Sequence, residues 1–287
     1  MGVIIIQIRR PLLIILMFVV AISFIITNNT KNDEELNDKI ITIQGVVKGK
    51  IEKKRYNQYK VGVFLINDYT KNKNLKIGQK VNITGKFKSL DKMKYDDFDY
   101  GRYIKSTGYK GIVYINNYKI IDKNKLYSLI GEIKFYISKT YRYLYKKNSD
   151  FINSILLAEV ENLTEEQKEI FTRTGTSHVI SISGLHTGIL CVIISFLLRG
   201  INKLYKLLIL SIFITLYCIM VGASPSIIRS IAFVMIFYLS IFIDRKKDGI
   251  SALSLIGIIL IMNNPYVIYN VSFQLSFLAT LSILIFY

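Results

Sequence analysis

The chain reads Arg173-Thr174-Gly175-Thr176-Ser177-His178-Val179-Ile180-Ser181-Ile182-Ser183-Gly184-Leu185-His186-Thr187-Gly188 where a polar segment opens into an apolar one. Both of its histidines, His178 and His186, lie in this stretch. Unsatisfied hydroxyl and backbone groups cost several kcal/mol each in hydrocarbon. We therefore expect this stretch to face water, protein or a cavity, which makes it the first place to look for function.

Apolar runs flank this stretch on both sides and predict a protein that crosses the membrane several times. The first run covers residues 11–27, and seventeen apolar residues just reach across a hydrocarbon core of about 30 Å. A cleaved signal peptide is the alternative, but the apolar run continues past the only small-x-small pattern, Ala21-Ile22-Ser23, which favours an uncleaved anchor. The later runs are 179–198, 207–222, 226–243, 250–262 and 267–287. The run 250–262 is short and ends at Asn263-Asn264-Pro265, so a re-entrant or broken helix stays open there.

Basic residues mark every second boundary between these runs. They are Arg9 and Arg10, then Arg199, Lys203 and Lys206, then Arg245, Lys246 and Lys247, whereas the alternate loops at 222–225 and 263–265 carry no lysine or arginine. Cytoplasmic loops carry such an excess of lysine and arginine. The pattern predicts a cytoplasmic N-terminus and an extracytoplasmic segment 28–150 in the cell membrane.

Segment 28–150 is strongly basic and reads as short strands. It holds 27 lysines and arginines against 13 acidic residues, within a chain of net charge +18. Runs of β-branched and aromatic residues occur at 40–47, 59–66, 79–87 and 110–115. Gly45, Gly62 and Gly85 inside these runs predict bulges or tight bends, which a small barrel needs at its corners. We therefore expect an OB-like all-β barrel.

Tyrosines alternate with the lysines of this segment. Cationic surfaces with aromatic platforms bind single-stranded nucleic acid by phosphate attraction and stacking. Two other interpretations stay open, namely plain solvation of a lysine-rich domain and attraction to anionic lipid or cell-wall polymer. The candidate DNA-binding residues are Lys48, Lys50, Lys53, Lys54, Tyr56, Tyr59, Lys86, Lys88, Tyr103 and Lys110.

Two helices are expected between the barrel and the polar stretch. Apolar residues at helical spacing predict a basic amphipathic helix over 128–147, which would lie on the outer membrane surface or pack on the barrel or the helices. Thr164 and Gln167 form a capping-box pattern that predicts a short helix from Glu165 to about Thr172, with Gly175 as its stop. The expected domains are 1–27, 28–125, 126–175 and 176–287.

The polar residues at bilayer depth allow several chemistries. His178 and His186 are eight positions apart, which is poor spacing for a metal pair, and no acidic ligand lies nearby. A Ser183–histidine nucleophile and a proton or substrate relay are further alternatives. We favour polar packing around a translocation path, and expect no metal, cofactor or catalytic residue. The candidate path residues are Arg173, His178, Ser183, Gly184, His186, Pro225, Arg229, Gln274 and Ser276.

Several motifs resemble those of the ComEC competence protein family. The stretch 171–188 is similar to the family signature, as are Ala223-Ser224-Pro225-Ser226-Ile227-Ile228-Arg229 and Phe273-Gln274-Leu275-Ser276-Phe277-Leu278-Ala279. Upstream, Phe98-Asp99-Tyr100-Gly101-Arg102-Tyr103-Ile104-Lys105-Ser106-Thr107-Gly108 resembles the motif at the end of the family's external OB domain. The motifs occur in the family's order along the chain.

The resemblance implies a polytopic helical membrane bundle with an inserted OB-like barrel. It also implies a channel component for uptake of single-stranded transforming DNA, working with a DNA receptor and a helicase-like ATPase, while self-association stays open. Many family members carry a histidine-rich nuclease domain, and both histidines here lie elsewhere, so we expect a truncated member without it. A non-conducting scaffold or remnant, and an intramembrane serine hydrolase, are the alternatives.

Overall fold

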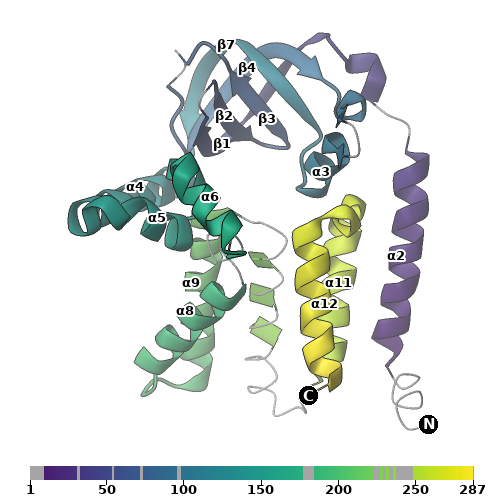
Figure 1. Ribbon diagram of the computed structural model, residues 1–287, viewed down its shortest axis with the longest axis vertical. Coiled ribbons are helices and arrows are strands. Elements are labelled where there is room, and N and C mark those ends of the chain that lie inside the picture. Colours follow the sequence, from purple (N-terminus) through teal and green to yellow (C-terminus); the bar gives the residue numbers. More distant parts are fainter. Residues whose placement is uncertain are drawn as a thin grey trace.

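A computed structural model describes residues 10–30, 33–53, 55–71, 74–95, 98–176, 184–222, 227–228, 231–232, 235–236 and 248–286. Figure 1 shows a β-barrel at one end of the molecule and a set of roughly parallel helices at the other. A layer of shorter helices lies between them. The expected combination of a small barrel with a largely helical remainder is confirmed.

The barrel consists of β1 (Ile40–Glu52), β2 (Asn57–Val61), β3 (Phe64–Asp68), β4 (Gln79–Lys88) and β7 (Gly111–Lys123). It closes in the order β1-β2-β3-β7-β4, with β4 returning to β1. The pairing of β3 with β7 is parallel, and the other four pairings are antiparallel. The predicted small β-barrel is therefore confirmed, and it is closed by five strands.

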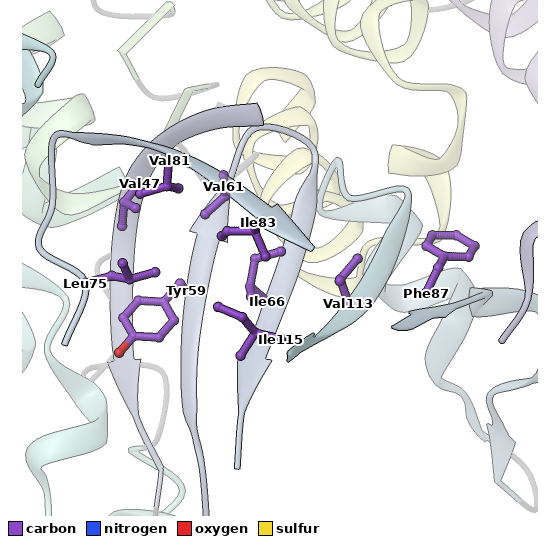
Figure 2. Packing of buried hydrophobic residues seen from close by; sticks show 10 residues of the cluster. All are labelled: Val47, Tyr59, Val61, Ile66, Leu75, Val81, Ile83, Phe87, Val113 and Ile115. Carbon is purple, nitrogen blue, oxygen red and sulfur yellow. The ribbon is translucent and has the colours of Figure 1, made fainter. Parts of the chain in front are cut away.

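The barrel is held by alternating apolar residues that point inward (Figure 2). In β4 the odd positions from Gln79 to Phe87 are buried, as expected for a strand with one face in a core. The cluster consists of Val47, Tyr59, Val61, Ile66, Leu75, Val81, Ile83, Phe87, Val113 and Ile115. Each fully buried aliphatic or aromatic side chain contributes about 1.5–3 kcal/mol of transfer free energy.

The run 59–66 and the glycines predicted at the barrel corners can be compared with the structure. The run 59–66 is not one strand but a hairpin, because Gly62 turns the chain between β2 and β3 with a φ of 58°. Gly85 sits at a register shift between β4 and β7, and a Cβ there would collide with the carbonyl oxygen of Tyr114. The expectation that glycines form the corners of the barrel holds at these two positions.

The helical part contains α2 (Pro11–Asn29), α8 (Gly184–Leu197), α9 (Lys203–Val221), α11 (Gly249–Asn263) and α12 (Val271–Phe286). Among the described residues, α2 and α9 are long and apolar enough to cross a membrane, while α8, α11 and α12 are shorter apolar helices. The six predicted spans are thus only partly reproduced, and most of 226–243 lies outside the described residues. The apolar windows of α2 and α9 are only 17% and 22% buried, unlike core helices of a soluble protein.

Two ends of the helical part are distinguished by their contacts. Helices α2 and α11 pack side by side around Leu16, Ile256 and Phe273. Arg10 and Asp248 form an ion pair of 3.7 Å where α2 and α11 begin, at the end away from the barrel. Arg10 is one of the basic residues predicted to be cytoplasmic, and the barrel lies beyond the other end of α2.

One long helix and four short ones form the layer between the barrel and the apolar helices. The long helix is α4 (Lys125–Tyr145), and the short ones are η3 (Lys146–Asn148), α5 (Ser149–Leu157), η4 (Val160–Asn162) and α6 (Glu165–Arg173). The predicted amphipathic helix corresponds to α4. The predicted short helix is α6, whose Thr164–Gln167 capping box is present in full, and Gly175 follows it with a φ of 68°.

Candidate nucleic-acid interface and membrane junction

The motif at 98–108 folds into a helix that leaves the barrel. It contains β6 (Phe98–Asp99), paired with β5 (Lys94–Tyr95), and then α3 (Tyr100–Ser106). Asp99 caps the helix, because its carboxylate accepts a hydrogen bond of 2.8 Å from the backbone N–H of Arg102. Gly101 lies against η2 (Leu90–Lys92), and its backbone N–H donates to the Met93 carbonyl at 3.1 Å. The helix is thereby fixed to the barrel at its first turn.

The other end of α3 docks on η5 (Pro265–Tyr269), the turn that joins α11 to α12. The Asn264 side-chain amide donates to the carbonyl oxygens of Lys105 and Ser106, at 2.9 and 3.3 Å. Asn270, which is buried, donates to the Ser106 hydroxyl at 3.2 Å and accepts from the Phe273 N–H at 3.1 Å. Asn264 thus satisfies carbonyls that the end of α3 leaves unpaired, and Asn270 satisfies an N–H at the start of α12.

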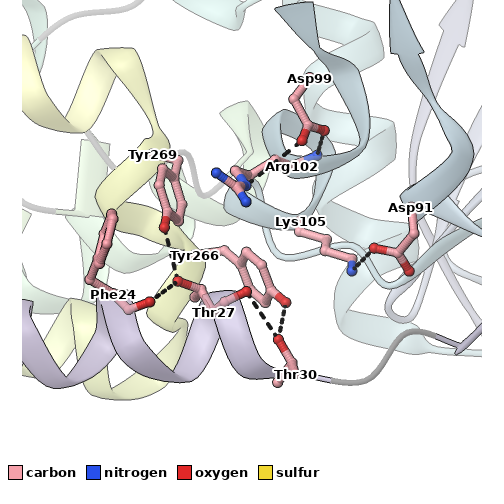
Figure 3. A network of polar contacts seen from close by, with 9 residues as sticks. All are labelled: Phe24, Thr27, Thr30, Asp91, Asp99, Arg102, Lys105, Tyr266 and Tyr269. Atoms are coloured by element: carbon pink, nitrogen blue, oxygen red, sulfur yellow. Dashed lines mark hydrogen bonds and ion pairs between the residues drawn. The ribbon is translucent and has the colours of Figure 1, made fainter.

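Two cation–aromatic contacts add to the junction (Figure 3). The Arg102 guanidinium lies 4.5 Å from the ring centroid of Tyr269, and the Lys105 amine lies 5.2 Å from that of Tyr266. Lys105 also binds Asp91 at 2.6 Å, which ties it back to the barrel. Such contacts contribute about 0.5–2 kcal/mol each, depending on burial.

The last turn of α2 joins the same junction. The Thr27 hydroxyl lies 3.0 Å from the Tyr269 hydroxyl, and the Thr30 hydroxyl lies 2.7 Å from the Tyr266 hydroxyl (Figure 3). Three separate segments of the chain therefore meet at one point: α2, α3 and the α11–α12 connection. The motif at 98–108 thus positions the barrel on the helices.

We expect Asn270→Ala to loosen this junction. The change removes the cap of α12, worth about 1 kcal/mol, and the hydrogen bond to Ser106, worth about 1 kcal/mol more. Together, about 2 kcal/mol raises hydrogen exchange of the α3 amides roughly 30-fold. Asn263→Ala, at an exposed position next to the junction, is the control, and equal exchange in the two variants would contradict the assignment.

A row of three tyrosines lies at the end of the β2–β3 hairpin that is opposite the turn at Gly62. Tyr56 precedes β2 and Tyr69 follows β3, and the pairing of Asn57 with Asp68 brings them together at 4.8 Å between ring centroids. Tyr114 of β7 extends the row, with its ring 5.8 Å from that of Tyr69. Tyr69 is 55% exposed. We name Tyr56, Tyr69 and Tyr114 the tyrosine row.

A lysine accompanies the tyrosine row. The Lys53 amine donates to the Tyr56 hydroxyl at 3.0 Å and lies 5.0 Å from the centre of its ring. Lys53 also interacts electrostatically with Tyr100 of α3 and Glu161 of η4, so this end of the barrel faces the layer of short helices. The chain places a cation beside adjoining, mutually tilted aromatic rings, on the side of the barrel that faces α3 and η4.

The other candidate DNA-binding residues differ in whether they are buried, exposed or engaged with neighbouring side chains. Tyr59 was a wrong choice, because its side chain is 0% exposed in the barrel core and contributes to packing instead. Lys48 and Lys110 are exposed, whereas Lys50 binds Glu52 at 2.6 Å. Other candidates are engaged elsewhere on the barrel: Lys86 and Lys88 with Asp38 at 3.1 and 3.9 Å, and Tyr103 with the rings of Phe98 and Tyr100. Lys54 lies outside the described residues.

Two lysines between the barrel and the helices beneath it, Lys60 and Lys134, are affected by burial. Burial lowers the pKa of Lys60 on β2, and nearby Glu161 opposes this effect. Burial likewise lowers the pKa of Lys134 on α4, where Glu159 is the largest opposing influence. These groups belong to the contact between the barrel, α4 and η4, so we assign Lys60 and Lys134 to that contact and not to a phosphate site.

The candidate path residues fall into three groups. His178, Ser183, Pro225 and Arg229 lie outside the described residues. Gly184 begins α8, and His186 lies in its first turn, partly buried. Arg173 is 2.7 Å from Glu169 on its own helix with 78% of its side chain exposed.

Gln274 and Ser276 lie in α12, near the membrane junction. The Gln274 side-chain amide donates to the Ile268 carbonyl at 2.7 Å, so it stabilises the connection of η5 to α12. The Ser276 carbonyl accepts from the Thr280 hydroxyl at 2.9 Å within the same helix. Within the described part of the chain, no three histidine, cysteine or acidic side chains are grouped so as to hold a metal ion.

Sequence reasoning missed the residues that form the junction, and its list of candidate residues held only Tyr56 of the tyrosine row. Asn264, Tyr266, Tyr269 and Asn270 come from one short connection. Asn264 had been read as part of the loop that ends the run 250–262, and Tyr269 and Asn270 as the start of the run 267–287. Their signal was the concentration of amide and phenol groups between two apolar runs. Tyr114 gave no separate signal, because its position beside Tyr69 depends on the parallel pairing of β3 with β7.

Comparison with known proteins relates part of the chain to competence proteins. Residues 155–287 match a family model described as competence protein. ComE operon protein 3 of Bacillus subtilis (strain 168) is 26% identical over 165 residues, covering 57% of this chain and 21% of that protein. An uncharacterized protein of Aquifex aeolicus (strain VF5) is 30% identical over 125 residues, covering 43% of this chain and 30% of that protein. The matches therefore span less than a third of either relative.

A solved structure, aspartyl tRNA synthetase from Entamoeba histolytica, aligns with 66% of this chain and 44% of its own. The TM-score of 0.23 at 12% identity is too low to indicate a shared fold.

The match of residues 155–287 to the competence family model and the likeness to ComE operon protein 3 support the resemblance to the ComEC family that the motifs implied. The apolar helices α2 and α9 fit a membrane protein of that kind.

Proposed function

We propose that this protein is a DNA-uptake component of the cell membrane whose barrel holds single-stranded DNA above the membrane helices. The observation that carries the proposal is the tyrosine row with Lys53 beside it. Aromatic rings stack on bases of any sequence, and lysines neutralise phosphates. In five-stranded OB barrels, the face of strands 2 and 3 and the loop between strands 1 and 2 bind oligonucleotides. Tyr56 and Lys53 occupy the corresponding loop here.

The position of the tyrosine row supports a direction in which bound single-stranded DNA would run. Lys53 faces Tyr100 of α3 and Glu161 of η4. The membrane junction holds α3 against the α11–α12 connection through Asn264 and Asn270. A strand bound at the tyrosine row would then pass toward the bundle, where the proposed path residues include His186 and Gln274. Exposed Lys48 and Lys110 would add phosphate contacts on the barrel surface.

The proposal includes the membrane orientation and the partners. The basic loops at 9–10, 199–206 and 245–247 would face the cytoplasm, with the barrel outside. The chain lacks a Gly-x4-Gly-Lys-[Ser/Thr] phosphate loop, so energy for strand movement would come from a separate helicase-like ATPase, and an outer receptor would deliver the DNA.

The full chain, reconstituted in lipid nanodiscs, tests the proposal by fluorescence anisotropy with a labelled oligothymidylate. For about five phosphate contacts, counterion release predicts that affinity falls roughly 100-fold between 50 and 200 mM salt. Lys48→Gln together with Lys110→Gln should flatten this dependence, whereas Lys168→Gln on α6 should leave it unchanged. Undetectable binding at 50 mM salt would remove DNA binding from the protein's role.

A further inference from the structure

Helix α4 carries an apolar face that the rest of the described chain leaves uncovered. Its residues are between 45% and 72% exposed: Leu126, Leu129, Ile133, Tyr136 and Leu144. We name these five residues the α4 face. On a helix they recur at spacings of three, four, seven and eight positions, so they lie along a single side. An apolar surface of this extent is unusual in water and marks an interaction site.

The direction of the α4 face follows from what touches the other sides of the helix. The barrel loop at Ile77 and Gly78 packs against Ser128 and Gly131. At 100° per residue, the α4 face is centred roughly 160° around the helix from those two positions. It therefore points away from the barrel.

The neighbouring side of α4 packs against a membrane helix. Tyr141 of α4 lies close enough to Tyr217 of α9 to influence it electrostatically. The Tyr217 hydroxyl also donates to the carbonyl of Leu156 in α5, at 3.1 Å. Tyr217 is one turn from the end of α9, at the barrel side of the molecule. Figure 1 shows α4 extending sideways there, while α8 and α9 run along the long axis.

Helix α4 and the residues that follow it are strongly basic. Between residues 125 and 148 the chain has six basic residues, Lys125, Lys134, Lys139, Arg142, Lys146 and Lys147, and one acidic residue, Glu132. A helix with an apolar face and basic flanks binds at the interface of a bilayer that contains anionic lipid. The outer end of α9 fixes α4 at the depth where such an interface would lie.

We propose that α4 is an interfacial helix whose α4 face is inserted among the lipids of the outer leaflet. The occupant of the face is lipid, because the face points away from the barrel and adjoins the side that packs on α9. The inference rests on the membrane placement proposed above, but it does not depend on DNA binding. Inserted in this way, α4 would fix the height and tilt of the barrel over the membrane.

Site-directed fluorescence tests the proposal on the full chain with Cys191→Ala and Cys218→Ala. Single changes Leu129→Cys and Ile133→Cys carry an environment-sensitive dye on the α4 face. Phe135→Cys is the control, because Phe135 is also exposed and lies on another side of the same helix. The protein is reconstituted in phosphatidylcholine vesicles containing phosphatidylglycerol, and quenching is measured with iodide in water and with doxyl-labelled lipid.

We expect lipid-borne doxyl to quench positions 129 and 133 at least about threefold more than position 135, and iodide to show the reverse order. Equal access of iodide to all three positions would place α4 in water and overturn the proposal. Protection of 129 and 133 from both quenchers would show that protein covers the face, which also overturns it. Oligothymidylate binding by the same vesicles is a separate readout, so loss of the DNA role and loss of the lipid contact are distinguished.

Discussion

Replacing Tyr69 with alanine is expected to weaken binding of single-stranded DNA roughly 10-fold, and the double change Tyr56→Ala with Tyr69→Ala roughly 100-fold. Stacking of one base on an aromatic side chain is worth about 1–3 kcal/mol, and about 1.4 kcal/mol is a factor of ten in affinity. Tyr69 is more than half exposed, so its removal should cost the barrel little stability. Anisotropy titration of the reconstituted full chain measures both effects.

Two matched changes separate stacking from other causes. Tyr69→Phe keeps the ring and loses only the hydroxyl, so it should bind as the parent does. Tyr143→Ala removes an exposed tyrosine of α4, away from the barrel strands, and should leave affinity unchanged. If Tyr69→Ala bound as tightly as Tyr69→Phe, the tyrosine row would not be the stacking platform, and the lysines alone would have to account for any affinity.

The barrel was predictable because its signals are local. β-branched runs bounded by polar residues located β1, β4 and β7, and glycines located the bend at Gly62 and the bulge at Gly85. The division of 57–68 into two strands was missed, because a single glycine such as Gly62 marks a bulge within one strand as readily as the turn of a hairpin. Alternation also could not say which tyrosines point inward, and so Tyr59 was assigned to the surface although it fills the core.

The junction could not be predicted, because it depends on contacts between distant segments. The bond from Asn264 to Lys105 joins residues 159 positions apart, and no local pattern encodes that pairing. The resemblance of 98–108 to a family motif marked the segment without revealing what it does. The capping box of α6 was predicted correctly because all its partners lie within four residues.

Gly101→Ala is expected to disrupt the membrane junction more severely than any single loss of a hydrogen bond there. A Cβ at this position would collide with the carbonyl oxygen of Leu90, which belongs to backbone in η2 and cannot rotate away. Helix α3 must then move off the barrel, and its far end loses the contacts of Lys105 and Ser106 with Asn264. Overpacking of this kind costs about 1–3 kcal/mol and occasionally more.

The expected result of Gly101→Ala is raised hydrogen exchange in both 98–108 and 264–270, together with a lower unfolding temperature of the reconstituted protein. Gly108→Ala is the informative control within the same motif. Gly108 has a φ of 90° and nothing within 4 Å of an added Cβ, so it should cost only the left-handed strain of about 1–2 kcal/mol. Exchange in Gly108→Ala should rise near residue 108 and stay unchanged at 264–270. If Gly101→Ala also left 264–270 unchanged, α3 would not couple the barrel to the membrane helices, and a strand held at the tyrosine row would have no fixed position above them.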